Sequence, residues 1–246
     1  ISFNDFDINK IKNLFFLLNI PFKAKWVCIH NRDNSYIQKS FKYISKQKIN
    51  ETNHRNFSIK DLKEAAQYLS NLGYYVIRVG NIQESRINYS SERIIDYSYS
   101  IHKNKLLDIY FLSNCEFYLG SDSGIGNISV IANKYVGLIN LTFWVNLQRQ
   151  NFKRIVIFKK FFSRNLNRFL SLNEIFTNNF HCLTEFSEFK RLNIELINNT
   201  QEEIRHLSIE LTDKIKGVSE ISHEDKKYHI KFWNIIKKYG LNERNN

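Results

Sequence analysis

Short apolar runs alternate with stretches of helical periodicity over the first 140 residues, and this alternation limits the folds open to the chain. Each run has the length of a buried strand, and each helical stretch carries an apolar stripe. Asn-Gly and Asp-Gly, the turns that join antiparallel strands directly, do not occur. The pattern therefore predicts an α/β fold, with a parallel sheet covered by helices on both faces. The predicted strands are residues 26–29, 74–79, 93–96, 116–119 and 135–139, and the predicted helices are 7–18, 58–73, 106–112 and 125–132.

Two of the predicted strands end in residues suited to binding a phosphate group. The first strand runs into His30-Asn31-Arg32-Asp33, and the fourth into Gly120-Ser121-Asp122-Ser123-Gly124. Ligands of parallel sheets bind beyond the carboxyl ends of the strands, so both segments are expected at one edge. The second strand ends there too, at Gly80. The sequence thus predicts a single anion-binding crevice.

Arg32 is the first candidate for holding the anion, because a planar guanidinium binds phosphate oxygens in pairs. The small residues in 120–124, which we call the seryl turn, let backbone N–H groups approach an anion in front of a helix. A structural interpretation stays open for both: Arg32 paired with Asp33 at the surface, and the turn serving only as a helix cap. The further candidates for anion contact are Arg55, Arg78, Gly80, Ser121, Asp122, Ser123 and Gly124.

His30 is a candidate base or a group that orients Arg32, although a histidine at a strand end also serves as a purely structural hydrogen-bonding residue. Asp33 and Asp122 are the carboxylates nearest the predicted crevice, and Asp122 is also placed to cap the next helix. No Asp-x-Asp stands where it would hold a divalent cation, and the spacing of His223 and His229 is poor for a metal. We therefore expect neither a metal nor a cofactor.

Composition indicates a globular chain with an anionic partner. Lysine and arginine number 36 against 24 acidic residues, which gives a net charge of +12 and favours a nucleotide, a nucleic acid or a lipid head group. Cys28, Cys115 and Cys182 are widely spaced among apolar residues, as expected of buried reduced thiols in a cytosolic protein. No apolar run is long enough to span a membrane. The start at Ile1 and the absence of methionine indicate part of a longer protein.

Beyond residue 140 the alternation weakens. A basic aromatic stretch, 152–169, is interpreted either as a core-facing helix or as an amphipathic face resting on an anionic membrane. Capping patterns at Ser171 and Thr200 predict two further helices, with a strand at 194–197 between them. The charged tail, 220–246, contains a stripe for docking formed by Tyr228, Phe232 and Ile235.

Several of these stretches, in this order, resemble a group of glycosyltransferases from bacterial cell-surface polysaccharide gene clusters, which are distantly similar to fucosyltransferase-like enzymes of the GT-B fold. The likeness covers approximately residues 7–217. One departure is Asn133-Lys134-Tyr135, where the family has a proline. The stretches that carry the likeness are residues 27–33 with Tyr36, 54–56, 73–80, 95–97, Asp108, 120–124, 158–160, 170–175 with Glu174, and 197–204.

The resemblance implies a Rossmann-like domain over residues 1–217 that corresponds to the C-terminal, nucleotide-sugar-binding half of a GT-B enzyme. Residues 218–246 would form a charged helical tail, and the N-terminal acceptor domain would be absent from this chain. His30, Arg32 and Asp33 become the catalytic candidates, and Glu174 a further candidate for donor contact.

The implied activity is metal-independent transfer of a sugar from a nucleotide-sugar to a glycan or lipid-linked glycan, as in lipopolysaccharide synthesis. We expect a cytoplasmic protein, with peripheral contact to the inner face of the cytoplasmic membrane and no nucleic-acid partner. The alternative is a non-catalytic module that binds nucleic acid or another polyanion.

Overall fold

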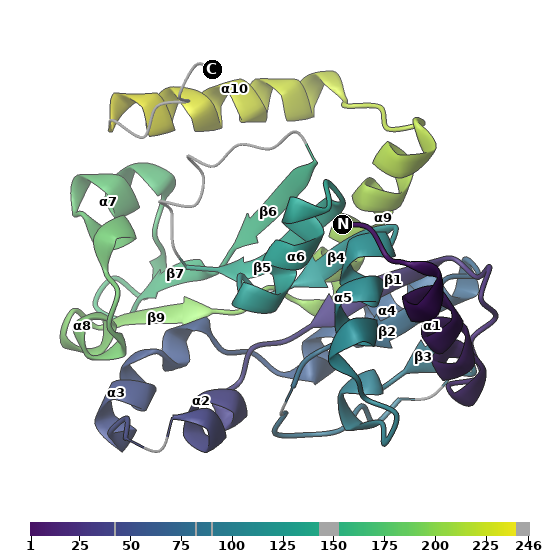
Figure 1. Ribbon diagram of the computed structural model, residues 1–246. Coiled ribbons are helices and arrows are strands. Elements are labelled where there is room, and N and C mark those ends of the chain that lie inside the picture. The colour runs from purple at the N-terminus through teal and green to yellow at the C-terminus, as the bar shows by residue number, and fades with distance from the viewer. Residues whose placement is uncertain (42, 82, 90, 143–152, 240–246) are drawn as a thin grey trace.

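The computed structural model describes residues 1–41, 43–81, 83–89, 91–142 and 153–239. Its centre is a six-stranded parallel sheet in the order β3-β2-β1-β4-β5-β6 (Figure 1). This is the strand order of a Rossmann fold, so the predicted parallel sheet is confirmed. The strands are β1 (Trp26–His30), β2 (Tyr75–Arg78), β3 (Ile94–Ile95), β4 (Phe117–Gly120), β5 (Tyr135–Leu141) and β6 (Arg154–Phe158).

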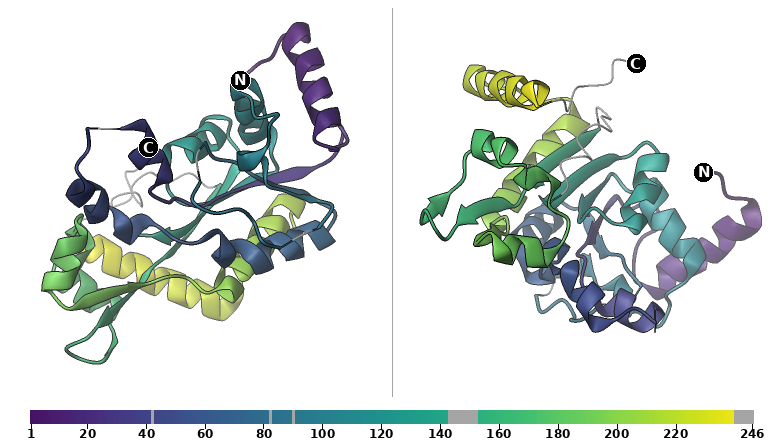
Figure 2. Two further views of the ribbon diagram at one scale, coloured as in Figure 1. Left: turned by 90° about the horizontal axis from the view of Figure 1, so that it is seen from below. Right: turned by 90° about the vertical axis from the view of Figure 1, so that its left-hand side faces the viewer.

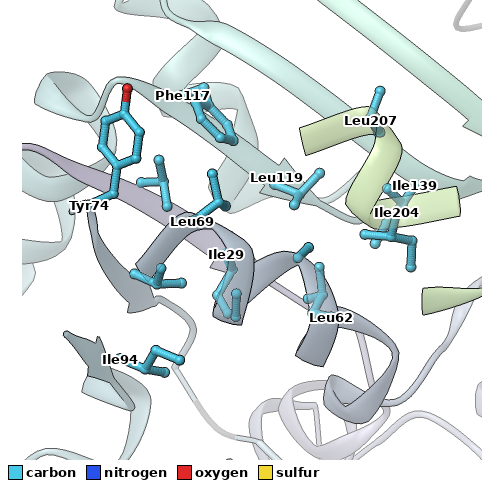
Figure 3. Close-up of a cluster of buried hydrophobic side chains, with 14 of the residues drawn as sticks. Ile29, Leu62, Leu69, Tyr74, Ile94, Phe117, Leu119, Ile139, Ile204 and Leu207 are labelled. Carbon is cyan, nitrogen blue, oxygen red and sulfur yellow. The ribbon is translucent and has the colours of Figure 1, made fainter. Parts of the chain in front are cut away.

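Two helices, α4 (Lys63–Asn71) and α9 (Gln201–Lys216), cover one face of the sheet (Figure 3). The apolar stripe of α4 meets side chains of β1, β2 and β4 that alternate with those of the opposite face. In α9 a capping box between Thr200 and Glu203 fixes the start, and Gly217 ends the helix in the left-handed region with φ 72°.

The other face is covered by α1 (Asp5–Leu17) and α5 (Lys105–Asn114), with the short α6 (Asn127–Ile131) beside them. Phe15 of α1 and Phe111 of α5 are fully buried and lie 5.2 Å apart between ring centroids. Figure 2 shows the sheet between these two layers of helices. Both faces are therefore closed, and polar side chains from the sheet reach solvent only at strand ends.

A second, antiparallel sheet, β8-β7-β9, continues from β6 and was not foreseen. The prediction of a helix in 153–169 is wrong, because Ile155, Val156 and Ile157 favour the extended chain and the residues that follow alternate in burial. Contact of this stretch with an anionic membrane stays a prediction. Phe152 lies outside the described residues. The strands are β7 (Lys160–Ser163), β8 (Arg168–Phe169) and β9 (Ile194–Ile197), packed with α7 (Leu172–Thr177), α8 (Phe186–Arg191) and α10 (His223–Lys238).

The tail helix α10 packs into the hydrophobic cluster that this second sheet shares with α7 and α8, through Phe232, Ile235 and the fully buried Ile236, whereas Tyr228 of the predicted stripe is 61% exposed. Cys28 and Cys115 are buried as predicted, but Cys182 is exposed, in a short turn after α7. No helix in the part of the chain that the structure describes is long and apolar enough to cross a membrane.

Candidate functional site

The strand order reverses between β1 and β4, and open parallel sheets bind ligands at this switch point. His30, the last residue of β1, is in register with Gly120, the last residue of β4. The Ser121 amide donates to the His30 carbonyl at 3.1 Å. A side chain at Gly120 would overlap that carbonyl oxygen, so glycine is what lets the strand ends lie so close. The two segments singled out in the sequence are therefore neighbours.

A cavity of about 600 Å³ opens at this edge of the sheet. Its volume is within the range of small-ligand sites. It joins the ends of β1, β2 and β4 with the first turn of α5 and with α2 (Ser35–Ser40), the short helix that follows β1. The lining residues are His30, Asn31, Arg32, Asp33, Tyr36, Ile37, Arg55, Gly80, Asn81, Gln83, Lys105, Asp108, Ser123, Gly124 and Ile125.

Arg32 is half-buried in the cavity wall and is held by neutral acceptors. Its guanidinium donates to the Thr52 carbonyl at 3.1 Å, to the Thr52 hydroxyl at 3.0 Å and to the Asn56 side-chain carbonyl. Burial, followed by the nearby Arg55 charge, lowers the pKa of Arg32 to about 10, although Asp33 opposes this. Within the described residues no acidic group forms a salt bridge with Arg32. The guanidinium is thus fixed in place while its charge is not cancelled by a paired carboxylate.

Arg55 brings a second guanidinium to the same wall. It lies in a 3-10 turn, Asn53–Arg55, and donates to the Asp122 carbonyl at 3.1 Å, which ties this turn to the seryl turn. Burial lowers the pKa of Arg55, and the Asp122 charge opposes the shift. Two partly desolvated cations that repel each other in one cavity wall form a site whose electrostatic energy falls when an anion binds.

The seryl turn contributes part of what was predicted for it. Ser123 and Gly124 line the cavity, whereas Ser121 is buried and its carbonyl accepts from the Tyr118 hydroxyl at 2.9 Å. Ser123 makes no side-chain cap bond to the following turn, so its hydroxyl is not consumed by capping. The expected helix is only a 3-10 turn, Gly124–Gly126, followed by five α-helical residues. Its dipole is correspondingly small.

His30 has a defined tautomer. Its Nδ1–H donates to the Val79 carbonyl at 3.0 Å, because a carbonyl can only accept. Burial lowers the pKa of His30 to about 4, and the charges of Arg78 and Lys103 contribute. At neutral pH the ring is therefore uncharged, with its lone pair on Nε2. A ring this weakly basic suits hydrogen-bond acceptance better than proton abstraction.

Asp33 holds two loops together. One carboxylate oxygen accepts from the Ser35 amide at 2.9 Å and the other from the Glu84 amide at 2.8 Å. Gly80, at the end of β2, has φ 144°, and a Cβ there would meet Gln83 and the His30 ring. Both residues thus shape the cavity wall, and the contacts of Asp33 are those of a structural clamp.

Four sequence candidates, Ser121, Asp122, Arg78 and Glu174, do not line the cavity, and the last two form ion pairs elsewhere. Arg78 is fully buried and donates to Asp96, to the Ser85 carbonyl, and to the side chains of Asn31 and Gln83. Its charge is matched inside the protein, so we withdraw it as a phosphate ligand. The Glu174 carboxylate accepts two hydrogen bonds from the Arg168 guanidinium and forms a capping box with Ser171 at the start of α7. These contacts lower the pKa of Glu174 to about 2 and leave it no role in the cavity.

Asp108 is a cavity residue to which sequence reasoning gave no role. It lies in the first turn of α5, and its Oδ1 is buried without a hydrogen-bond partner among the described groups. Burial raises the pKa of Asp108, with the Lys103 charge and a contact with the Tyr97 hydroxyl opposing. The sequence carries no signal for this role, because acidic residues are common in the first turn of a helix, where they need no functional reason.

No three or more histidine, cysteine or acidic side chains gather into a possible metal site in the described ranges. The expectation about metals and cofactors therefore stays a prediction.

No family model matches the sequence, and a search of curated proteins gave no significant match. Among solved structures, the chain is similar to the dodecameric iron-containing heptosyltransferase TibC in complex with ADP-D-beta-D-heptose, at 13% identity and a TM-score of 0.45. That alignment covers 79% of this chain and 47% of the other. The chain is also similar to the wall teichoic acid polymerase TagF, at 12% identity and a TM-score of 0.35, over 95% of this chain and 49% of that one. This chain thus spans about half the length of each.

Proposed function

We propose that this chain is the donor-binding part of a glycosyltransferase, and that the cavity at the β1/β4 switch point holds the diphosphate of a nucleotide-sugar. The observation that carries the proposal is the convergence of Arg32, Arg55, Ser123 and Gly124 on one cavity. The sequence resemblance to enzymes of surface polysaccharide synthesis supports the same reaction class.

Sugar transfer develops negative charge on the departing nucleoside diphosphate, and groups fixed in advance stabilise that charge most effectively. Arg32 is fixed by three acceptor groups and Arg55 by the Asp122 carbonyl. Both guanidiniums carry their charge at any physiological pH, so they would supply what a divalent cation supplies in other transferases. We accordingly propose metal-independent transfer.

Asp108 is the proton acceptor that we propose for the acceptor hydroxyl. Among the described residues, one imidazole and two carboxylates line the cavity, those of His30, Asp33 and Asp108. Two of them are poorly suited as the base, because His30 is weakly basic and both Asp33 oxygens accept from backbone amides. A carboxylate with a raised pKa is a better general base at neutral pH. The acceptor itself would be a bacterial surface glycan or its lipid-linked precursor.

The proposal is tested by titrating the 246-residue chain with UDP, GDP, ADP, CDP and dTDP by calorimetry, at 50 and 200 mM salt and with EDTA. We expect one nucleoside diphosphate to bind with modest salt dependence and no need for a metal. Arg32→Met should weaken this binding at least tenfold, since a charge-assisted phosphate contact is lost. Arg93→Met, which removes the same charge outside the cavity, is the matched control.

Two results would contradict the proposal. One is that folded Arg32→Met binds every nucleoside diphosphate as well as the parent does. The other is that none of them binds, while single-stranded nucleic acid binds with an affinity that falls steeply with salt, as a polyanion-binding module requires.

A further inference from the structure

Two kinds of group line the cavity, and we refer to them as its cationic side and its apolar side. Arg32, Arg55 and the seryl turn supply charge and polar donors, whereas Tyr36, Ile37 and Ile125 supply apolar surface. Inorganic phosphate or a bare carboxylate would use only the first side. A ligand that uses both must join a charged group to an apolar or planar one.

Tyr36 is the aromatic residue of that apolar side. It lies in the first turn of α2, four residues after Arg32, and remains 45% exposed although it faces the cavity. Phe41, at the end of the same helix, meets it edge to face, with ring centroids 6.0 Å apart and an interplanar angle of 81°. This contact supports the ring, and the 45% exposure of Tyr36 leaves surface on which a planar ligand can stack.

We propose that Tyr36, braced by Phe41, is the stacking surface for the nucleobase of the donor. This inference rests on the proposed function and assigns the part of the ligand that the diphosphate site does not hold. Stacking on an aromatic ring is favourable for every base. The identity of the base would then be read by polar groups that line the same cavity, Asn81 and Gln83.

A long lipid tail fits the observations less well. The apolar side is formed by three residues, and the whole cavity measures about 600 Å³. A flat ring of limited area matches such a surface better than an extended hydrocarbon chain does. A prenyl group is therefore the competing occupant, and the test includes it as a probe.

The test compares inorganic pyrophosphate, geranyl diphosphate and the five nucleoside diphosphates in calorimetric titrations of the full chain. We expect a nucleoside diphosphate to bind at least tenfold more tightly than pyrophosphate. Tyr36→Ala should weaken nucleoside diphosphate binding by roughly 5- to 100-fold, the range for loss of one stacked base, and leave pyrophosphate binding within about twofold. Tyr36→Phe should behave as the parent does.

Tyr43→Ala is the matched control, because Tyr43 is fully exposed, lies in the same segment and does not line the cavity. Circular dichroism establishes whether each variant is folded. If Tyr36→Ala does not fold, Tyr36→Phe, which keeps the aromatic ring, tests stacking instead. Arg32→Met should weaken pyrophosphate and nucleoside diphosphates alike, which reports on the diphosphate site separately from the base.

The inference is overturned if pyrophosphate binds as tightly as every nucleoside diphosphate, or if Tyr36→Ala weakens both equally. Tighter binding of geranyl diphosphate than of any nucleotide overturns it in favour of a lipid. In each of these cases, pyrophosphate binding that depends on Arg32 would still support the proposed diphosphate site. Absence of binding by all probes would remove the proposed function together with this inference.

Discussion

Arg32 and Arg78 stand just beyond β1 and at the end of β2, two adjacent parallel strands, yet they are used in different ways. Arg78 is fully buried, and its guanidinium lies 3.3 Å from the Asp96 carboxylate. Arg32 is half-exposed in a cavity and is held by the Thr52 and Asn56 oxygens, which are neutral. An arginine whose acceptors are neutral keeps its charge for a ligand, whereas one paired with a carboxylate serves the fold.

The largest effect expected from this comparison is on stability. Arg78→Met should lower the free energy of unfolding by about 3 kcal/mol, because it removes one partner of a largely buried ion pair and leaves the Asp96 carboxylate with only the Ile87 amide and the Ser98 hydroxyl as donors among the described residues. Urea denaturation followed by circular dichroism measures it. Arg32→Met is the matched variant and should change stability by less than about 1 kcal/mol, since its acceptors can turn to water. Equal destabilisation by the two substitutions would erase the distinction.

His30 links the two strand ends and gives the next largest effect, which depends on pH. Its folded pKa of about 4 lies below the ordinary 6.5, so the neutral ring contributes stability above pH 6.5 that is lost as pH falls toward 4. A shift of this size corresponds to about 3 kcal/mol. Urea midpoints measured from pH 7.5 to 4.5 should fall less steeply for His30→Gln than for the parent.

The His30→Gln variant also separates this effect from that of a second histidine. His54 also has a pKa lowered to about 4, mainly by burial, so His30→Gln should retain part of the acid dependence. An unchanged slope between pH 6.5 and 4.5 in that variant would show that His30 is not buried in its neutral form.

The parallel sheet could be predicted because β-branched and aromatic runs of fixed length alternate with helical stripes, and such local patterns survive folding. The meeting of Arg32 with the seryl turn could be predicted as well, since parallel strands end at one edge. The different roles of Arg32 and Arg78 could not be predicted from the sequence, because both residues follow an apolar run. What separates them is Asp96, eighteen residues away from Arg78 and brought to it only by the pairing of β2 with β3.

Asn56→Asp tests whether a neutral acceptor is what keeps Arg32 available. The substitution places a carboxylate on the guanidinium and makes the site resemble that of Arg78. Affinity for the nucleoside diphosphate should fall about tenfold, or about 1.4 kcal/mol. Asn56→Ala loses the same amide contact to Asn34 without adding charge, and it should weaken binding less. Equal affinities for the two variants would show that the charge on Arg32 does not contribute to binding.

Asp108 gives the smallest stability effect and the sharpest contrast with Asp96, because its carboxylate is desolvated with only partial compensation from Lys103. A carboxyl whose folded pKa is raised contributes stability below pH 3.8 that is lost as pH rises through the folded pKa. Asp108→Asn should therefore be more stable than the parent at pH 7, by less than about 1 kcal/mol given its partial exposure, and this gain should vanish near pH 4. Transfer from a bound nucleotide-sugar, measured in the longer enzyme of which this chain is the proposed donor-binding part, should meanwhile fall by about 10²–10⁴, the contribution of a general base. If Asp108→Asn loses both stability and transfer, Asp108 is a structural residue like Asp96. If the variant gains stability but loses transfer, Asp108 is held in an unfavourable environment that serves the chemistry.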